Sequence, residues 1–214
     1  MMKVRAIEPD DLDDIAGACL VALAAGAGDD WSVPAGELDW TCRRTLDHLV
    51  DVMVFYAVHL ASRATGRLPL ARDGDQGVTI DDLLTLTRAT AAVLSGVARA
   101  AAPGARGFHP SGMADAAGFV AMGATELLVH TRDILSGLGR PFRPANEHLN
   151  LVLARIFPWA PADEPDRWAV FLYECGRAPL GDRPRRDPNW YWHSAPLDEW
   201  DGTVKRRTRP PGWR

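Results

Sequence analysis

Glu126 and His130 are spaced so that their side chains can act together. They lie four residues apart, and a helix with 3.6 residues per turn places them on the same side, about 6 Å apart along its axis. Asp133 follows three residues later, close to the same line. A carboxylate and an imidazole on one helix face can bind a metal ion, although the same spacing also occurs in ordinary intrahelical surface pairs.

The residues around this pair are mostly apolar. An unpaired charge beside an apolar stripe is costly unless a partner or a metal ion satisfies it. The stretch 123–139 therefore predicts part of a helix whose inner face needs a partner elsewhere in the chain. The apolar neighbours are Phe119, Val120, Leu127, Leu128, Ile134 and Leu138.

His48 offers that partner, on a long helix predicted from about Thr41 to Thr65. If the two helices are neighbours, His48, Glu126 and His130 bring two nitrogens and one carboxylate oxygen to one point. Three protein ligands with a fourth position open are typical of catalytic zinc, and nickel, iron and manganese accept the same ligand types. For His48 taken alone, a partly buried histidine with an ordinary hydrogen bond is the simpler interpretation.

The other histidines do not extend this set. His59 returns to the same side of its predicted helix as His48, but about 16 Å further along the axis, so it cannot share the site. His109, His148 and His193 lie in or near Pro-rich or polar segments and receive no role. Arg43, Arg44 and Arg132 could face an anionic ligand, although solvated surface charge is the simpler interpretation.

Charge is distributed unevenly along the 214 residues, whose net charge is −4. Residues 1–176 hold 15 Lys and Arg against 23 Asp and Glu, whereas residues 177–214 hold 9 against 5. An acidic body argues against nucleic acid as the main partner, because nucleic-acid binding depends on clustered cations. The simpler expectation is a basic tail that docks on its own acidic body.

Apolar runs and cysteines indicate the compartment. The best candidate for a membrane span, Leu49 to Ala61, contains Asp51 and His59, and the first residues lack the apolar core of a secretory signal. We therefore expect a cytoplasmic protein that does not cross a membrane. Cys19, Cys42 and Cys175 are odd in number and widely spaced, which favours buried reduced thiols over a disulfide framework.

Hydrophobic periodicity predicts an all-α fold, with no segment of strand period. Residues 1–140 are expected to hold four helices that pack as a bundle and carry the metal site, and the loop 66–78 is long enough to cross from one end of a bundle to the other. Residues 141–214 are expected to add two short helices and an irregular Trp- and Pro-rich tail packed on the bundle. The last residues, Lys205 to Arg214, are expected to fray. Beyond the second helix given above, the predicted helices cover about 9–25, 79–102, 113–138, 147–157 and 164–175.

Two runs of the chain resemble a known family. DWTCRRTLDHL at 39–49 and ELLVHTRDILSGLG at 126–139 are similar to elements of the N-terminal domain of mycothiol-dependent maleylpyruvate isomerases, in the DinB superfamily. The resemblance covers residues 9–140. Beyond it, LARIFPWAP at 153–161, FLYECGRAPL at 171–180 and WYWHSAPL at 190–197 resemble the tails of uncharacterised actinobacterial members.

The resemblance implies a DinB-like four-helix bundle and a metal, usually zinc, held by His48, Glu126 and His130. It also implies mycothiol as a thiol cofactor or co-substrate and a small-molecule electrophile as the other substrate. Zinc lowers the pKa of a bound thiol, so that a nucleophile exists at neutral pH. The expected function is a metal-dependent, thiol-dependent transferase or isomerase, in which Asp133 orients His130 or pairs with Arg132 or another cation.

The chain departs from the isomerases after the bundle. Their C-terminal α/β domain resembles sterol-carrier proteins and contributes to the substrate site, whereas this chain has two short helices and a tail there. Maleylpyruvate isomerisation itself is therefore not expected. A metal-dependent hydrolase and a non-catalytic DinB-like binding or stress-response protein are the alternatives. A homodimer through an apolar outer face of the first or third helix is a further possibility.

Overall fold

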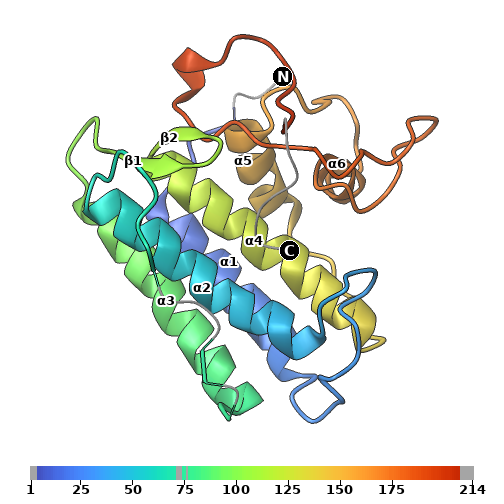
Figure 1. Cartoon of the computed structure of the whole chain (residues 1–214). Coiled ribbons are helices and arrows are strands. Elements are labelled where there is room, and N and C mark those ends of the chain that lie inside the picture. The colour runs from blue at the N-terminus through green and yellow to red at the C-terminus, as the bar shows by residue number, and fades with distance from the viewer. Residues whose placement is uncertain (1–3, 71–73, 76, 208–214) are drawn as a thin grey trace.

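The structure is a computed structural model that describes residues 4–70, 74–75 and 77–207. The predicted all-α class is confirmed in that the described residues are mostly helical (Figure 1). The helices are α1 (Pro9–Ala24), α2 (Cys42–Ala61), α3 (Ile80–Ala100), α4 (Ala116–Gly137), α5 (Asn146–Ile156) and α6 (Arg167–Glu174), with a 3-10 turn at Leu197–Glu199. Two short strands, β1 (Arg106–His109) and β2 (Gly112–Asp115), stand between α3 and α4.

Polar side chains start the three longest helices. Thr41, Thr79 and Asp115 precede α2, α3 and α4, and the side-chain oxygen of each accepts a hydrogen bond from a backbone N–H in the first turn. Such caps satisfy donors that have no partner within the helix. The helix predicted over about 79–102 begins close to where α3 begins, with the backbone N–H of Asp82 donating to Thr79.

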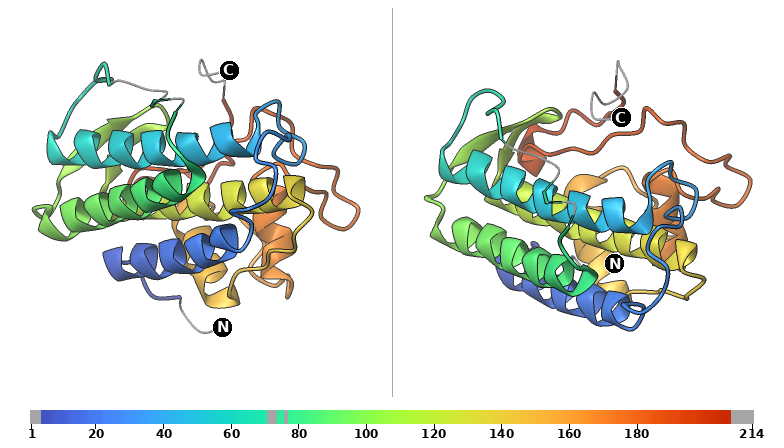
Figure 2. Two further views of the ribbon diagram at one scale, coloured as in Figure 1. Left: turned by 90° about the horizontal axis from the view of Figure 1, so that it is seen from below. Right: turned by 60° about the horizontal axis from the view of Figure 1, so that its bottom comes forward.

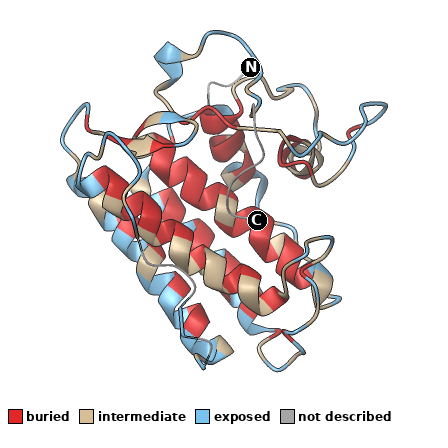
Figure 3. Ribbon diagram, in the orientation of Figure 1, coloured by how far each residue is buried: buried red, intermediate tan, exposed pale blue. Residues whose placement is uncertain are grey.

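Helices α1 to α4 pack side by side with their apolar faces inward (Figures 2 and 3). The guanidinium of Arg43, near the start of α2, donates to the carbonyl of Val78, just before α3, at 2.5 Å. The other end of α2 lies against β1, which follows α3. Helices α2 and α3 therefore run in the same direction, and residues 62–79 connect them as the predicted long crossover, of which 71–73 and 76 lie outside the described residues.

The hairpin of β1 and β2 corrects the expectation of no strand. Its register pairs Arg106 with Asp115 and His109 with Gly112, around a turn at 110–111. Each strand is only four residues long, too short for its period to be visible in the sequence. The hairpin is fixed by its neighbours, because a Cβ at Gly107 would lie 2.4 Å from the carbonyl oxygen of His59 at the end of α2. Only glycine allows this close approach.

The C-terminal segment packs on the bundle as expected. Helix α5 contacts α4, α6 contacts α5, and one continuous apolar core includes residues of all of them. Arg155 of α5 is buried and donates to Asp115 at the start of α4, at 2.5 Å, and to the carbonyls of His193 and Ser194. These bonds hold the tail against the hairpin end of α4.

The expected fraying of Lys205 to Arg214 is wrong for the part that the structure describes. Arg206 pairs with Trp190 in a β-bridge, and the backbone N–H of Arg207 donates to the carbonyl of Asn189 at 2.8 Å. Residues 208–214 lie outside the described residues. The described chain contains no helix long and apolar enough to cross a membrane.

The outer faces of α1 and α3 carry a few exposed apolar side chains, which are Val21, Leu86 and Val93. These are the faces where a dimer contact was expected. The homodimer stays a prediction.

Candidate metal centre

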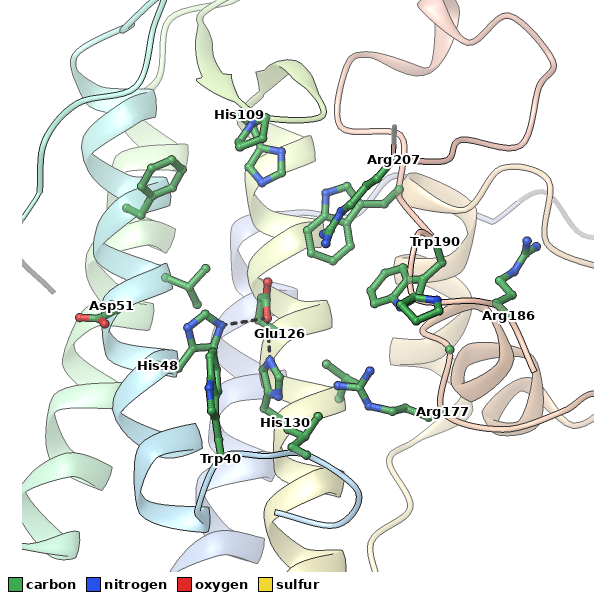
Figure 4. Close-up of a pocket in the computed structure, with 18 of the residues that line it drawn as sticks. Trp40, His48, Asp51, His109, Glu126, His130, Arg177, Arg186, Trp190 and Arg207 are labelled. Atoms are coloured by element: carbon green, nitrogen blue, oxygen red, sulfur yellow. Dashed lines mark ion pairs between the residues drawn. The ribbon is translucent and has the colours of Figure 1, made fainter. Parts of the chain in front are cut away.

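His48, Glu126 and His130 lie together between α2 and α4 (Figure 4). The Oε2 atom of Glu126 is 3.1 Å from Nε2 of His130 and 3.7 Å from Nε2 of His48. One donor atom from each residue lies within 4.8 Å of the other two. The residues singled out from the sequence are therefore brought to one point by two helices that are neighbours in the bundle.

The two helices position these side chains in different ways. On α4, the four-residue spacing of Glu126 and His130 places them one turn apart. On α2, His48 lies in the second turn, and its ring lies 5.1 Å from the ring of Trp40, which comes before the helix. The guanidinium of Arg44 covers the same tryptophan at 4.9 Å from its ring centre. Trp40 thus forms a wall beside His48.

Tyr56 fixes the carboxylate of Glu126. Its hydroxyl donates a hydrogen bond to Oε1 of Glu126 at 3.1 Å. The other carboxylate oxygen, Oε2, therefore faces the two histidines. Burial raises the pKa of Tyr56 well above its usual range, and the charge of Glu126 raises it further. The hydroxyl therefore keeps its proton and remains a donor.

Asp133 and Arg177 stand behind His130. The Oδ2 atom of Asp133 lies 3.3 Å from Nδ1 of His130 and 2.7 Å from a terminal nitrogen of Arg177. Arg132 also contacts Asp133, at 3.2 Å. Asp133 thus pairs with cations and lies at ion-pair distance from His130, although Nδ1 of His130 makes no hydrogen bond within the described residues. A carboxylate behind a histidine fixes the ring so that Nε2 faces the site.

Charge interactions outweigh burial in this cluster. Burial alone would raise the pKa of Glu126, but hydrogen bonds with His130 and His48 hold it well below its usual range. Asp133 behaves in the same way, because His130 and Arg177 offset its burial. Burial would lower the pKa of His130, yet its contacts with Asp133 and Glu126 raise it. Two ionised carboxylates therefore hold His130 between them.

A cavity of about 640 Å³ opens onto these residues. One wall comes from α2 and α4, with His48, Tyr56, Glu126 and His130. The opposite wall comes from the C-terminal segment (Figure 4). That wall, called the tail wall below, consists of Gly176, Arg177, Arg185, Arg186, Pro188, Trp190, Trp192 and Arg207.

The tail wall and the hairpin supply lining residues that the sequence did not indicate. Arg207 and Trp190 reach into the cavity from the tail, and His109 reaches it from β1 (Figure 4). Arg67, in the crossover, lines it as well. Arg43, Arg44 and Arg132, the arginines considered for an anionic ligand, do not line it. Only the clustering of arginine and tryptophan in the tail could have indicated this wall.

His59 has a structural role. Its Nδ1 atom lies 2.8 Å from the carbonyl oxygen of Phe55, and its Nε2 atom accepts from the backbone N–H of Leu68 at 3.1 Å. The ring is buried, and burial lowers its pKa. Among the described residues, the cluster of His48, Glu126 and His130 does not include His59.

The cysteines of the chain are buried and free, as expected. Burial raises the pKa of Cys19 to about 12 and that of Cys42 to about 11. The pKa of Cys175 also lies well above its usual range because of burial. A thiol of this kind is inert at neutral pH, so a thiolate at this cavity has to come from another molecule.

Comparisons of the chain with models of protein families, with curated proteins and with solved structures found no match.

Proposed function

We propose that His48, Glu126 and His130 bind a zinc ion and that the protein is a zinc-dependent transferase or isomerase that uses a small thiol, with mycothiol as the thiol implied by the family resemblance. The proposal includes membership of the DinB-like family. The observation that carries it is the convergence of two imidazole nitrogens and a carboxylate oxygen at the side of a cavity.

The donor set fits zinc. Two ligands at about 2.0 to 2.1 Å from a tetrahedral ion lie about 3.3 Å apart. The separations of 3.1 and 3.7 Å about Oε2 of Glu126 are close to that value. The backing of His130 by Asp133 and the bond from Tyr56 to Glu126 are the outer contacts that metal ligands normally have.

The surrounding residues suit a reaction between two small molecules. A bound zinc ion supplies the Lewis acidity that keeps a coordinated thiol ionised at neutral pH. The residues of the chain fix the ligands, and Trp40 and the tail wall line the cavity around the donor atoms. The cavity, at about 640 Å³, is within the size range of small-molecule sites.

The test begins with metal content. Protein purified without an affinity tag is dialysed against zinc and then against buffer, and bound metal is measured by mass spectrometry. We expect one zinc per chain in the wild type and loss of zinc in His48→Ala, Glu126→Ala and His130→Ala. His148→Ala, on α5 and outside the cavity, is the matched control that keeps its zinc. Full retention of zinc in all three site variants would refute the metal site.

The second part of the test addresses the reaction. Zinc-loaded protein is mixed with mycothiol and an unsaturated ketone, and loss of free thiol is followed with a chromogenic disulfide. We expect the thiol to be consumed faster than in the uncatalysed reaction. This excess rate should disappear when a zinc chelator is added and in the Glu126→Ala variant. If zinc binds but neither thiol consumption nor hydrolysis of an aryl ester depends on it, the enzyme proposal is wrong and a binding protein remains.

A further inference from the structure

His109 is a buried histidine with one unused hydrogen-bond donor at the cavity. Its exposed fraction is 4%, and its ring packs between Tyr56 and Trp192, with ring centres 5.7 and 5.9 Å away. It comes from β1, so it approaches the cavity from the hairpin end, whereas the candidate zinc ligands come from the helices (Figure 4). A buried polar group of this kind normally has a partner.

The hydrogen bonds of His109 define which nitrogen carries its proton. The backbone N–H of Ser111 lies 3.1 Å from Nδ1 and can only donate, so we assign Nδ1 as the acceptor and place the proton on Nε2. The hydroxyl of Ser111 lies 2.5 Å from the same Nδ1 and 2.8 Å from the hydroxyl of Ser194, and in this assignment its proton points to Nδ1. Within the described part of the chain, no residue accepts a hydrogen bond from Nε2. The turn of the hairpin therefore fixes a ring whose second N–H is free for a ligand.

We propose that the Nε2–H of His109 donates a hydrogen bond to the carbonyl oxygen of the substrate. This inference rests on the proposed function, in which the substrate carries a carbonyl group conjugated with a C=C double bond, and it adds the residue that contacts the carbonyl oxygen. His109 is then a catalytic residue that contacts the oxygen on which negative charge develops.

Conjugate addition places that charge on the carbonyl oxygen. The thiolate sulfur forms a bond to the β-carbon, and the π bond between the α- and β-carbons breaks. The electron pair moves to the carbonyl oxygen as an enolate, and the proton that the thiol released returns to the α-carbon. His109 keeps its own proton and donates a hydrogen bond to the enolate oxygen.

The environment of His109 suits a neutral donor. Burial lowers its pKa to about 3, although the charge of Glu126 acts in the opposite direction. The ring is therefore uncharged at neutral pH and does not carry a mobile extra proton. A neutral imidazole can polarise a carbonyl oxygen in this way. Donors aimed at developing charge in a shielded cavity contribute strongly to rate.

Two substitutions separate donation from packing. His109→Phe keeps an aromatic ring against Tyr56 and Trp192 but removes the N–H, whereas His109→Gln keeps an N–H near the position of Nε2 but loses the ring. The assay uses zinc-loaded protein, mycothiol and benzylideneacetone. We expect kcat to fall about a hundredfold to a thousandfold in His109→Phe, as for the loss of one oxyanion donor, and to stay within about tenfold of wild type in His109→Gln.

Zinc content and thermal unfolding of both variants are measured in parallel and are expected to match wild type. Unchanged kcat in His109→Phe would overturn the inference. An equal loss in both variants would also overturn it, because it would assign His109 to packing alone.

A binding experiment covers the case in which the wild type shows no turnover or a variant does not fold. Metal-free wild-type protein, labelled with ¹⁵N in histidine, is titrated with benzylacetone, a ketone, and with butylbenzene, which has the same carbon skeleton without the oxygen. We expect the Nε2 signal of His109 to shift with the ketone only. If it does so while zinc or turnover is absent, the proposed function fails and the carbonyl site stands. Equal or absent shifts with the two compounds contradict the carbonyl site.

Discussion

The two walls of the cavity differ in how their charges are stabilised. On the helical wall, partly buried Glu126 and buried His130 contact each other, with Asp133 and Tyr56 behind them. On the tail wall, Arg185 pairs with Glu37 near the surface, where both side chains are largely exposed. Buried charges need their partners, whereas exposed charges are screened by water. The helical wall should therefore respond sharply to substitution, and most of the tail wall should not.

The largest expected effect is a loss of zinc affinity in Glu126→Gln. The matched control, Glu37→Gln, should keep its zinc affinity. Both glutamates line the cavity, but only Glu126 contacts the histidines. Changes behind a metal ligand already cost about tenfold to a hundredfold in affinity, so removal of the ligand charge should cost more than about a hundredfold. Competition with a fluorescent zinc chelator measures this. Equal affinities in the two variants would remove the distinction between the walls.

Arg177 is the exception on the tail wall, because it pairs with Asp133, whose side chain is 1% exposed. Removal of one partner from a buried pair typically costs about 3 to 5 kcal/mol, so Arg177→Met should lower the free energy of unfolding by about that amount. Arg185→Met, from the same wall, should cost less than about 1 kcal/mol. Urea unfolding of both metal-free variants gives the comparison. If Arg177→Met lowers the free energy of unfolding only slightly, Arg132 and His130 alone are enough to stabilise the buried charge of Asp133.

Two buried histidines, His109 in the cavity and His59 outside it, predict a dependence of stability on pH. The pKa of His109 is about 3 in the folded protein against an ordinary value of 6.5, so the unfolded chain binds more protons between these values. Its contribution to stability is complete above about pH 6.5 and is lost as the pH falls towards 3, on the order of a few kcal/mol. Buried His59, whose pKa burial also lowers, acts in the same direction. The free energy of unfolding in urea, measured on metal-free protein, should therefore vary less with pH in His109→Phe than in the wild type. Parallel pH profiles of the two proteins would contradict the conclusion that the His109 ring is uncharged at neutral pH.

The smallest effect expected is that of Tyr56→Phe. The change removes one hydroxyl, which donates to Oε1 of Glu126, and leaves the ring in the core. Zinc affinity should fall about tenfold, at the lower end for residues behind a metal ligand. Tyr191→Phe, in the tail, should leave zinc affinity unchanged in the same competition assay. Equal values for both variants would mean that the hydroxyl of Tyr56 does not orient the carboxylate.

The helical wall could be predicted from the sequence, because helical spacing fixes where Glu126 and His130 point and the apolar faces of α2 and α4 bring His48 to them. The tail wall could not. Its backbone has no repeating period, so contacts that are distant in sequence determine where Arg177 and Arg207 lie. His109 was missed for a related reason, since β1 is short and is held by its close approach to α2.

The bond between Arg177 and Asp133 also bears on the order of events during synthesis. The two residues are 44 positions apart in sequence, and all three candidate zinc ligands precede Arg177. A ribosome therefore adds the candidate ligands to the chain before it adds the arginine that pairs with Asp133 behind His130. A nascent chain that ends in α5 contains the candidate ligands but not the arginine that supports Asp133. If the proposed zinc site is correct, we expect full zinc affinity only in a chain extended beyond residue 177.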